Sequence, residues 1–149
     1  MVKWLVVLLR MGLGAAFVYA GVIKIQDPSE FAINVASFGI LPNALISPMA
    51  LTLPPFEIIT GGLLIIGVAR RPAALGIAFL SAVFLVAIAA ALARGLTIDC
   101  GCFGSGTPSR ARMWLDLGRD GVLLAAALTV YLFGNSKRAT ATEISADAA

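Results

Sequence analysis

The sequence lacks histidine altogether and contains only two cysteines among its 149 residues. Without histidine, the protein cannot have histidine-ligated haem, the usual zinc and copper sites, or a mechanism that uses imidazole as a general base. Two cysteines also cannot complete a four-ligand metal site unless carboxylates or a second chain supply the other ligands. The sequence therefore predicts no metal site built from this chain alone.

Charged residues are scarce as well, since they make up 13% of the chain, whereas 60% of the residues are hydrophobic. A soluble domain of this length cannot bury so much apolar surface. The formal net charge is only +3, and the basic residues are scattered between apolar stretches, so a nucleic-acid partner is not expected. The composition predicts a single-domain protein in contact with a lipid bilayer.

Long apolar stretches, by contrast, recur along the chain. A helix of about 20 residues crosses the roughly 30 Å hydrocarbon core of a bilayer. Four segments meet this length: residues 4–23, 49–68, 73–93 and 114–133. We therefore predict an all-α fold, an integral membrane four-helix bundle within residues 1–135. The small and polar residues 136–149 predict a disordered cytoplasmic tail.

An alternative interpretation of residues 4–23 is a signal peptide, with Lys3 as its basic end and residues 18–20 as a small-residue cleavage site. Arg10 argues against this alternative, because it interrupts the apolar stretch close to its start. A membrane span is therefore the favoured interpretation of this segment.

Basic residues next to the span ends indicate the orientation in the membrane, because Lys and Arg of short loops gather on the cytoplasmic side. The turn with Arg70 and Arg71 and the flank with Lys137 and Arg138 are the clearest signals. They favour both termini in the cytoplasm. The loop that carries the cysteines then faces outward, toward the oxidising side of the membrane, where disulfides persist.

Residues 27–38, between the first two spans, carry the signals of a short helix. Asp27 suits the N-cap, Pro28 suits the first helical position, and Glu30 stands where a capping box needs a carboxylate. Apolar residues then recur at helical spacing from Phe31 onward. The pattern predicts an amphipathic helix at the outer membrane interface, or alternatively a loop that packs its aromatic side chains on the bundle.

Ionisable residues inside the spans require an explanation, because placing each one in a bilayer costs free energy unless it is paired or hydrated. The helical rise places Lys24, Glu57, Arg119 and Asp120 in the outer half of the bundle, together with the cysteine loop, and Arg10 in the inner half. One interpretation is that these charges pair and fix the packing, for example Arg119 with Glu57. The other is that Glu57 or Asp120 moves protons or binds a ligand, as in a transporter.

The two cysteines, Cys100 and Cys102, are separated only by Gly101 and lie in the loop between the last two apolar segments. A disulfide between cysteines this close is tight and therefore labile, which suits a bond that is passed on. Asp99 raises the pKa of a neighbouring thiol or acts as a base. The alternatives are a structural disulfide, half of a metal site completed by a partner, or two idle thiols. We interpret Cys100 and Cys102 as the catalytic pair.

A family resemblance rests on motifs that run along most of the chain. They are Gly12 to Gly21 in the Arg-containing first span, Gly21-x-x-Lys24-x-x-Asp27-Pro28, Phe31, Phe38, Leu41-Pro42, Leu53-Pro54, Glu57, Gly61, Arg94-Gly95-Leu96-x-Ile98-x-Cys100-Gly101-Cys102-Phe103-Gly104 and Arg119-Asp120. With these motifs the chain resembles the DoxX-like membrane proteins and, within them, the methylamine-utilisation MauE family. The likeness covers about residues 5–133, and the Cys-Gly-Cys-Phe-Gly element is its most specific part.

The resemblance implies a four-helix membrane protein that helps to mature the disulfide-rich small subunit of methylamine dehydrogenase. It also implies a thioredoxin-like, membrane-anchored partner and an exported client. From it we expect a membrane thiol–disulfide oxidoreductase, with a quinone as a possible electron carrier. The alternative is a non-enzymatic assembly factor or anchor whose disulfide only braces the loop.

Overall fold

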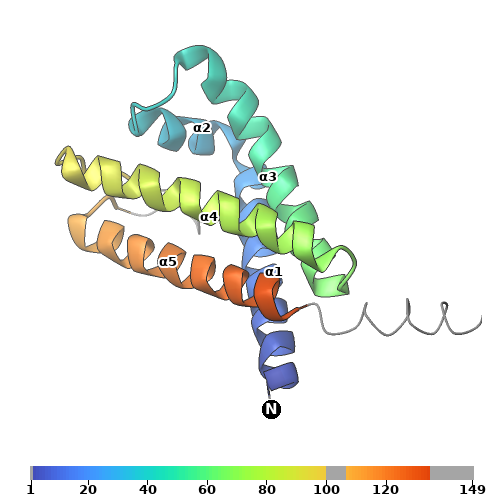
Figure 1. Ribbon diagram of the computed structural model, residues 1–149. Coiled ribbons are helices and arrows are strands. Elements are labelled where there is room, and N and C mark those ends of the chain that lie inside the picture. Colours follow the sequence, from blue (N-terminus) through green and yellow to red (C-terminus); the bar gives the residue numbers. More distant parts are fainter. Residues whose placement is uncertain (1, 100–106, 135–149) are drawn as a thin grey trace, which may run out of the picture.

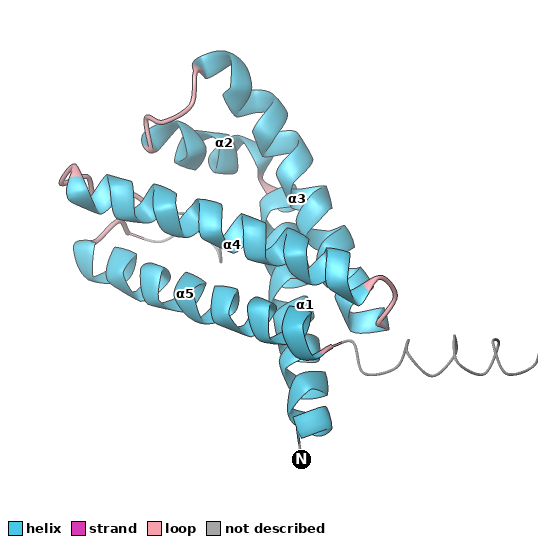
Figure 2. Cartoon of the chain, viewed as in Figure 1, coloured by secondary structure: helices cyan, strands magenta, loops and turns pink. Residues whose placement is uncertain are grey.

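The computed structural model describes residues 2–99 and 107–134, and within them the chain folds into five α-helices (Figure 1). The helices are α1 (Val2–Gln26), α2 (Pro28–Ser37), α3 (Asn43–Ile66), α4 (Arg70–Ala93) and α5 (Arg110–Phe133). Short loops join α1 to α2, α2 to α3 and α3 to α4 (Figure 2). The prediction of an all-α fold is confirmed. The expected tail, residues 136–149, lies outside the described residues.

Three of the helices are long and apolar enough to cross a membrane: Trp4–Gln26, Asn43–Ile66 and Arg70–Ala93. They expose large apolar side chains to their surroundings, with Ile66 74% and Phe79 68% exposed. Exposed apolar surface on this scale is costly in water and favourable in lipid. The chain is therefore a membrane protein.

The fourth expected span, residues 114–133, falls within α5, which begins earlier, at Arg110. Five charged residues occupy the first eleven positions of α5, so among the described helices it is not one of the three that are apolar enough to span a bilayer. Arg119 and Asp120 lie near the middle of α5 rather than in its first turns. The helix itself is confirmed, whereas its membrane crossing stays a prediction.

Helix α3 begins at Asn43 and not at the expected residue 49, and it contains Pro48, Pro54 and Pro55. Proline removes a backbone hydrogen bond from a helix interior and therefore disfavours a helix at these positions. Transmembrane helices tolerate proline because neighbouring groups satisfy the freed carbonyls. Packing against α1 and α2 thus overrides the local signal.

The short helix α2 forms as its capping signals predict. Asp27 Oδ1 accepts hydrogen bonds from the Glu30 backbone N–H at 3.0 Å and from Ser29 Oγ at 2.6 Å, and these bonds lower the pKa of the Asp27 carboxyl. Phe31 and Val35 are buried in the core. The expected helix is therefore correct and its apolar face packs on the bundle, whereas its position at the membrane interface stays a prediction.

Two packed pairs of helices make up the bundle, α1 with α3 and α4 with α5, and α1 also contacts α5 (Figure 1). A small apolar cluster holds the ends of α4 and α5 next to α2. Its buried members are Phe38, Ile88, Ala91, Leu92 and Met113. This cluster matters for function because the cysteine segment leaves α4 and enters α5 at this end of the bundle.

Candidate functional site

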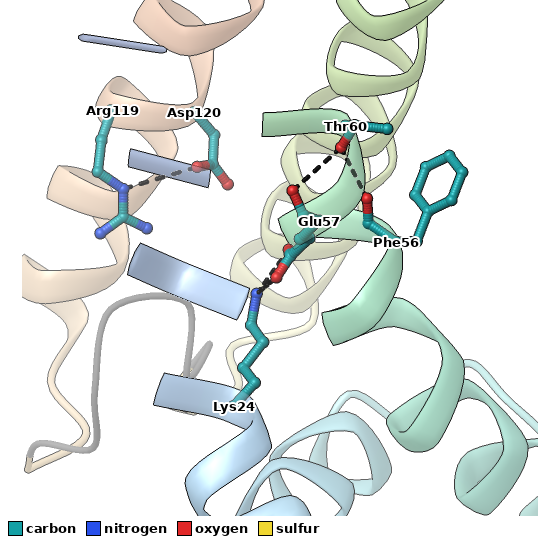
Figure 3. A network of polar contacts seen from close by, with 6 residues as sticks. All are labelled: Lys24, Phe56, Glu57, Thr60, Arg119 and Asp120. Carbon is teal, nitrogen blue, oxygen red and sulfur yellow. Dashed lines mark hydrogen bonds and ion pairs between the residues drawn. The ribbon is translucent and has the colours of Figure 1, made fainter. Parts of the chain in front are cut away.

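A buried ion pair joins α1 to α3. Lys24, in the last turn of α1, places its Nζ 2.7 Å from Glu57 Oε1 and 2.8 Å from Oε2 (Figure 3). The two residues are only 2% and 1% exposed. The Lys24 ammonium also lies 5.2 Å from the ring centre of Phe31 and 5.1 Å from that of Phe84. Aromatic faces attract a cation at this distance, so the ammonium is stabilised from α2 and α4 as well.

The expected pairing of Glu57 with Arg119 is wrong. Arg119 instead lies 2.9 Å from Asp116 through its Nη1, and its Nε lies 3.6 Å from Asp120 Oδ1. Residues three positions apart face the same side of a helix, so Asp116 is within reach of Arg119 without any tertiary contact. Lys24 takes Glu57 because α1 and α3 pack closely at this level, where a Cβ on Gly21 would lie 3.3 Å from the Glu57 Cβ.

A cavity of about 20 Å³ lies beside this ion pair, between α1, α3, α4 and α5. It is lined by Phe17, Ala20, Lys24, Glu57, Ser81, Phe84, Asp120 and Leu123. A space of this size accommodates about one water molecule. Ser81 Oγ and Asp120 Oδ2 are buried there and have no hydrogen-bond partner among the described residues. The lining therefore offers a water molecule several polar partners inside an otherwise apolar wall.

Two carboxylates, Glu57 and Asp120, and one ammonium, Lys24, line the cavity, and the Arg119 guanidinium lies 3.6 Å from Asp120 outside its wall. Ser81 and Asp120 lie near the middle of α4 and α5, so this polar lining can hold a water molecule in the middle of the bundle.

The sequence placed Lys24, Glu57 and Asp120 in one half of the bundle, and the structure brings all three to the same cavity. Arg119 is not in the cavity wall, although it contacts Asp120. Sequence reasoning missed Ser81, which is buried in α4. Its signal was present, because Ser81 is the one polar side chain within the apolar segment 73–93.

The predicted catalytic residues Cys100 and Cys102, with Gly101 between them, lie outside the described residues. Asp99, the last described residue before them, is half-buried. The segment that leads to the cysteines is held at two points. The Arg94 guanidinium donates a hydrogen bond to the Phe38 carbonyl at the end of α2.

The second point of attachment lies on α5, where the Ile98 backbone N–H donates to Met113 Sδ at 3.5 Å. On the far side of the cysteines, Ser109 caps α5 by accepting from the Arg112 N–H at 3.2 Å. The described flanks of the cysteine segment are therefore anchored to α2 and α5. Among the described residues, no group of three or more Cys, Asp or Glu side chains could hold a metal ion.

The chain is similar to known proteins along most of its length. The family model of methylamine utilisation protein MauE matches residues 2–133. A relative from Paracoccus denitrificans, named methylamine utilization protein MauE, is 37% identical over 131 residues, which cover 87% of this chain and 68% of the relative. No solved structure matches the chain.

Two further relatives carry the same name. The protein from Methylorubrum extorquens is 40% identical over 109 residues, covering 72% of this chain and 58% of the relative. The protein from Paracoccus versutus is 40% identical over 121 residues, covering 80% of this chain and 64% of the relative. The chain thus spans less than two thirds of the length of these two relatives.

Proposed function

Because the chain belongs to the family of methylamine utilisation protein MauE, we propose that it acts in methylamine utilisation as a membrane thiol–disulfide oxidoreductase. Its client is an exported protein of the type of the methylamine dehydrogenase small subunit, and its redox partner is a thioredoxin-like protein. Cys100 and Cys102 carry the chemistry.

One feature carries the proposal. The only two cysteines of the chain lie one residue apart in the connection between α4 and α5. The segment that leads to them is tied to α2 through Arg94 and to α5 through Ile98. Anchored flanks keep a reactive segment at one end of the helix bundle. A partner protein can then dock at that end and reach the cysteines in a defined orientation.

The chemistry is a pair of exchange reactions. A client thiolate attacks the Cys100–Cys102 disulfide and forms a mixed disulfide, and the second client thiolate then displaces the bound cysteine. The client gains a disulfide, while Cys100 and Cys102 become thiols and take up two protons. The thioredoxin-like partner restores the pair by the same exchange, so that its own disulfide becomes a dithiol.

A quinone does not fit the cavity beside Lys24 and Glu57. The cavity measures about 20 Å³, whereas sites for small organic molecules begin at about 300 Å³. Re-oxidation is therefore assigned to the protein partner and not to a quinone bound in this cavity. The cavity suits a proton carried by water, and it lies near the middle of α4 and α5.

We also propose that α5 is a fourth span, which makes the protein a four-helix integral bundle of the bacterial inner membrane. Support comes from its packing along α4 and against α1. The Arg119–Asp116 pair and the burial of Asp120 lower the cost of its charges in the bilayer. The Arg70–Arg71 turn then faces the cytoplasm with both termini, and the cysteine loop faces the periplasm.

Replacing either cysteine with serine tests the function. In a methylamine-utilising bacterium whose own copy is deleted, Cys100→Ser and Cys102→Ser are expected to abolish growth on methylamine. The client small subunit is expected to carry free thiols, because serine cannot form the exchanging disulfide. Growth rates and a thiol-alkylation gel shift of the client measure the two effects.

Thr107→Ala is the matched control, because this exposed loop residue lies beyond the cysteines. It is expected to leave growth and client disulfides unchanged. If both cysteine variants still support growth and full client oxidation, the oxidoreductase proposal is wrong and the protein is a non-enzymatic assembly factor.

A further inference from the structure

The opposite end of the bundle carries a group of arginines around the turn between α3 and α4. Gly67 ends α3 in a left-handed conformation with a φ of 84°. A Cβ on Gly67 would lie 2.8 Å from Arg10 Nη1 and 3.3 Å from Arg70 Nε. The guanidinium groups of Arg10 and Arg70 therefore border the same point of this turn, although they come from α1 and α4. Arg71 follows next on α4.

These arginines have no acidic partner among the described residues. Arg70 Nε donates to the Gly67 carbonyl at 3.0 Å, and Arg71 lies 5.7 Å from the ring centre of Tyr131. Arg10 Nε is buried and has no hydrogen-bond partner in the described part of the chain. Along α3, Glu57 is ten residues from Gly67, which corresponds to about 15 Å of helix. Adjacent guanidinium groups without a carboxylate repel each other. The positive charge at this end of the bundle is therefore not balanced by negative charge from the described residues.

The start of α4 adds to the positive field at this turn. Ala69, the N-cap residue, has a φ of 51° and no side-chain hydrogen bond caps the helix. The first N–H groups of a helix are directed outward, and they carry the positive end of its dipole. Backbone N–H groups at a helix start together with arginines make a site that suits a phosphate.

The surroundings of this site are apolar and exposed. Ile66 and Val68 border the turn, and Leu132 and Phe133 end α5 beside Tyr131; all four are exposed. An anion that reaches this turn from a bilayer arrives with acyl chains that can cover these side chains. The ends of transmembrane helices lie at the level of lipid head groups, where arginine clusters bind anionic lipids.

We propose that Arg10, Arg70, Arg71 and the N-terminus of α4 form a binding site for the phosphate of an anionic phospholipid. The phosphate pairs with guanidinium groups from α1 and α4 and removes the repulsion between them. The bound lipid also joins the N-terminal half of α1 to the α3–α4 turn. The site is separate from the cavity around Lys24 and Glu57 and does not depend on the cysteines.

Lipid binding to the full chain in detergent tests this site. Native mass spectrometry is used to titrate the protein with dioleoylphosphatidylglycerol and, separately, with dioleoylphosphatidylcholine. The unsubstituted protein is expected to bind the anionic lipid at least about tenfold more tightly, because the choline cation of the zwitterionic lipid offsets the attraction between its phosphate and the arginines. Arg10→Gln and Arg70→Gln are each expected to reduce this affinity about tenfold.

Arg112→Gln is the matched control, because it removes the same charge from an exposed residue at the other end of the bundle. It is expected to change the affinity less than about twofold. An equal loss in Arg112→Gln, or equal affinity for both lipids, overturns the proposal. If Arg10→Gln does not fold, Arg70→Gln and Arg71→Gln test the same site, because both residues are exposed. Thermal unfolding checks that each variant is folded.

Inorganic phosphate distinguishes a lipid site from a site for a free anion. Phosphate added at the same concentration as phosphatidylglycerol is expected to leave the lipid bound, because it lacks acyl chains to cover Ile66 and Val68. Displacement of the lipid by equimolar phosphate overturns the assignment to a lipid.

Discussion

Replacing Glu57 with alanine is expected to lower the free energy of unfolding by about 3–5 kcal/mol, which is the usual cost of breaking a buried ion pair by removing one partner. Lys24 is 2% exposed, and its ammonium donates hydrogen bonds to both Glu57 carboxylate oxygens. Without Glu57 the ammonium stays buried between α1 and α3, and the rings of Phe31 and Phe84 replace only a fraction of the lost attraction.

A double-mutant cycle checks the reason for this loss. Lys24→Met alone is expected to destabilise the protein, since it leaves the Glu57 carboxylate buried without its cation. The combination of Lys24→Met with Glu57→Leu is expected to recover most of the stability, because apolar residues of similar volume replace a buried pair at little cost. Reversible unfolding in detergent micelles, followed by circular dichroism, gives the free energies.

Glu30→Ala is the matched control, because Glu30 is a half-buried carboxylate on α2 for which no ion pair is found among the described residues. It is expected to change the free energy of unfolding by less than about 1 kcal/mol. Strictly additive effects of the Lys24 and Glu57 substitutions would contradict a direct coupling between the two charges.

Gly61→Ala is expected to destabilise the protein by about 1–3 kcal/mol through overpacking, although alanine is the better helix former. A Cβ on Gly61 would lie 2.7 Å from the Gly14 carbonyl oxygen and 3.0 Å from the Val18 backbone nitrogen on α1. These are backbone atoms, so they move away only if α1 and α3 separate along their whole contact.

Gly62→Ala, one position further along α3, is the matched control. No atom lies within 4 Å of a Cβ placed on Gly62, so this substitution is expected to leave stability unchanged or to raise it by up to about 1 kcal/mol. The same unfolding experiment in micelles compares the two variants. Equal stabilities for Gly61→Ala and Gly62→Ala would show that α1 and α3 do not pack this closely.

The close packing of α1 on α3 also affects the candidate site. A Cβ on Gly21 would lie 2.8 Å from the Pro54 carbonyl oxygen, one turn before Glu57. Small residues at Gly14, Gly21 and Gly61 thus keep the two backbones close along the α1–α3 contact, and Gly21 does so at the level where Lys24 meets Glu57. We therefore expect Gly61→Ala to weaken the buried ion pair as well as the helix contact.

The sequence by itself determined the helices and the kind of environment in which they lie. Apolar segments longer than about 18 residues predict membrane helices, and this prediction does not depend on their tertiary contacts. The cap at Asp27 and Pro28 predicted α2 because it depends on backbone groups within one turn. Local chemistry of this kind needs no knowledge of the fold, and the structure agrees with it.

Only the tertiary structure decided which charges meet and where α3 begins. Lys24 and Glu57 are 33 positions apart, so their pairing depends on how closely α1 and α3 approach. Arg119, the partner expected for Glu57, instead forms an ion pair with Asp116 on its own helix. The cavity wall combines side chains from α1, α3, α4 and α5, and the arginines at the α3–α4 turn come together in the same way. Side chains far apart in sequence interact only after packing sets the distance between their helices, and sequence periodicity does not contain that distance.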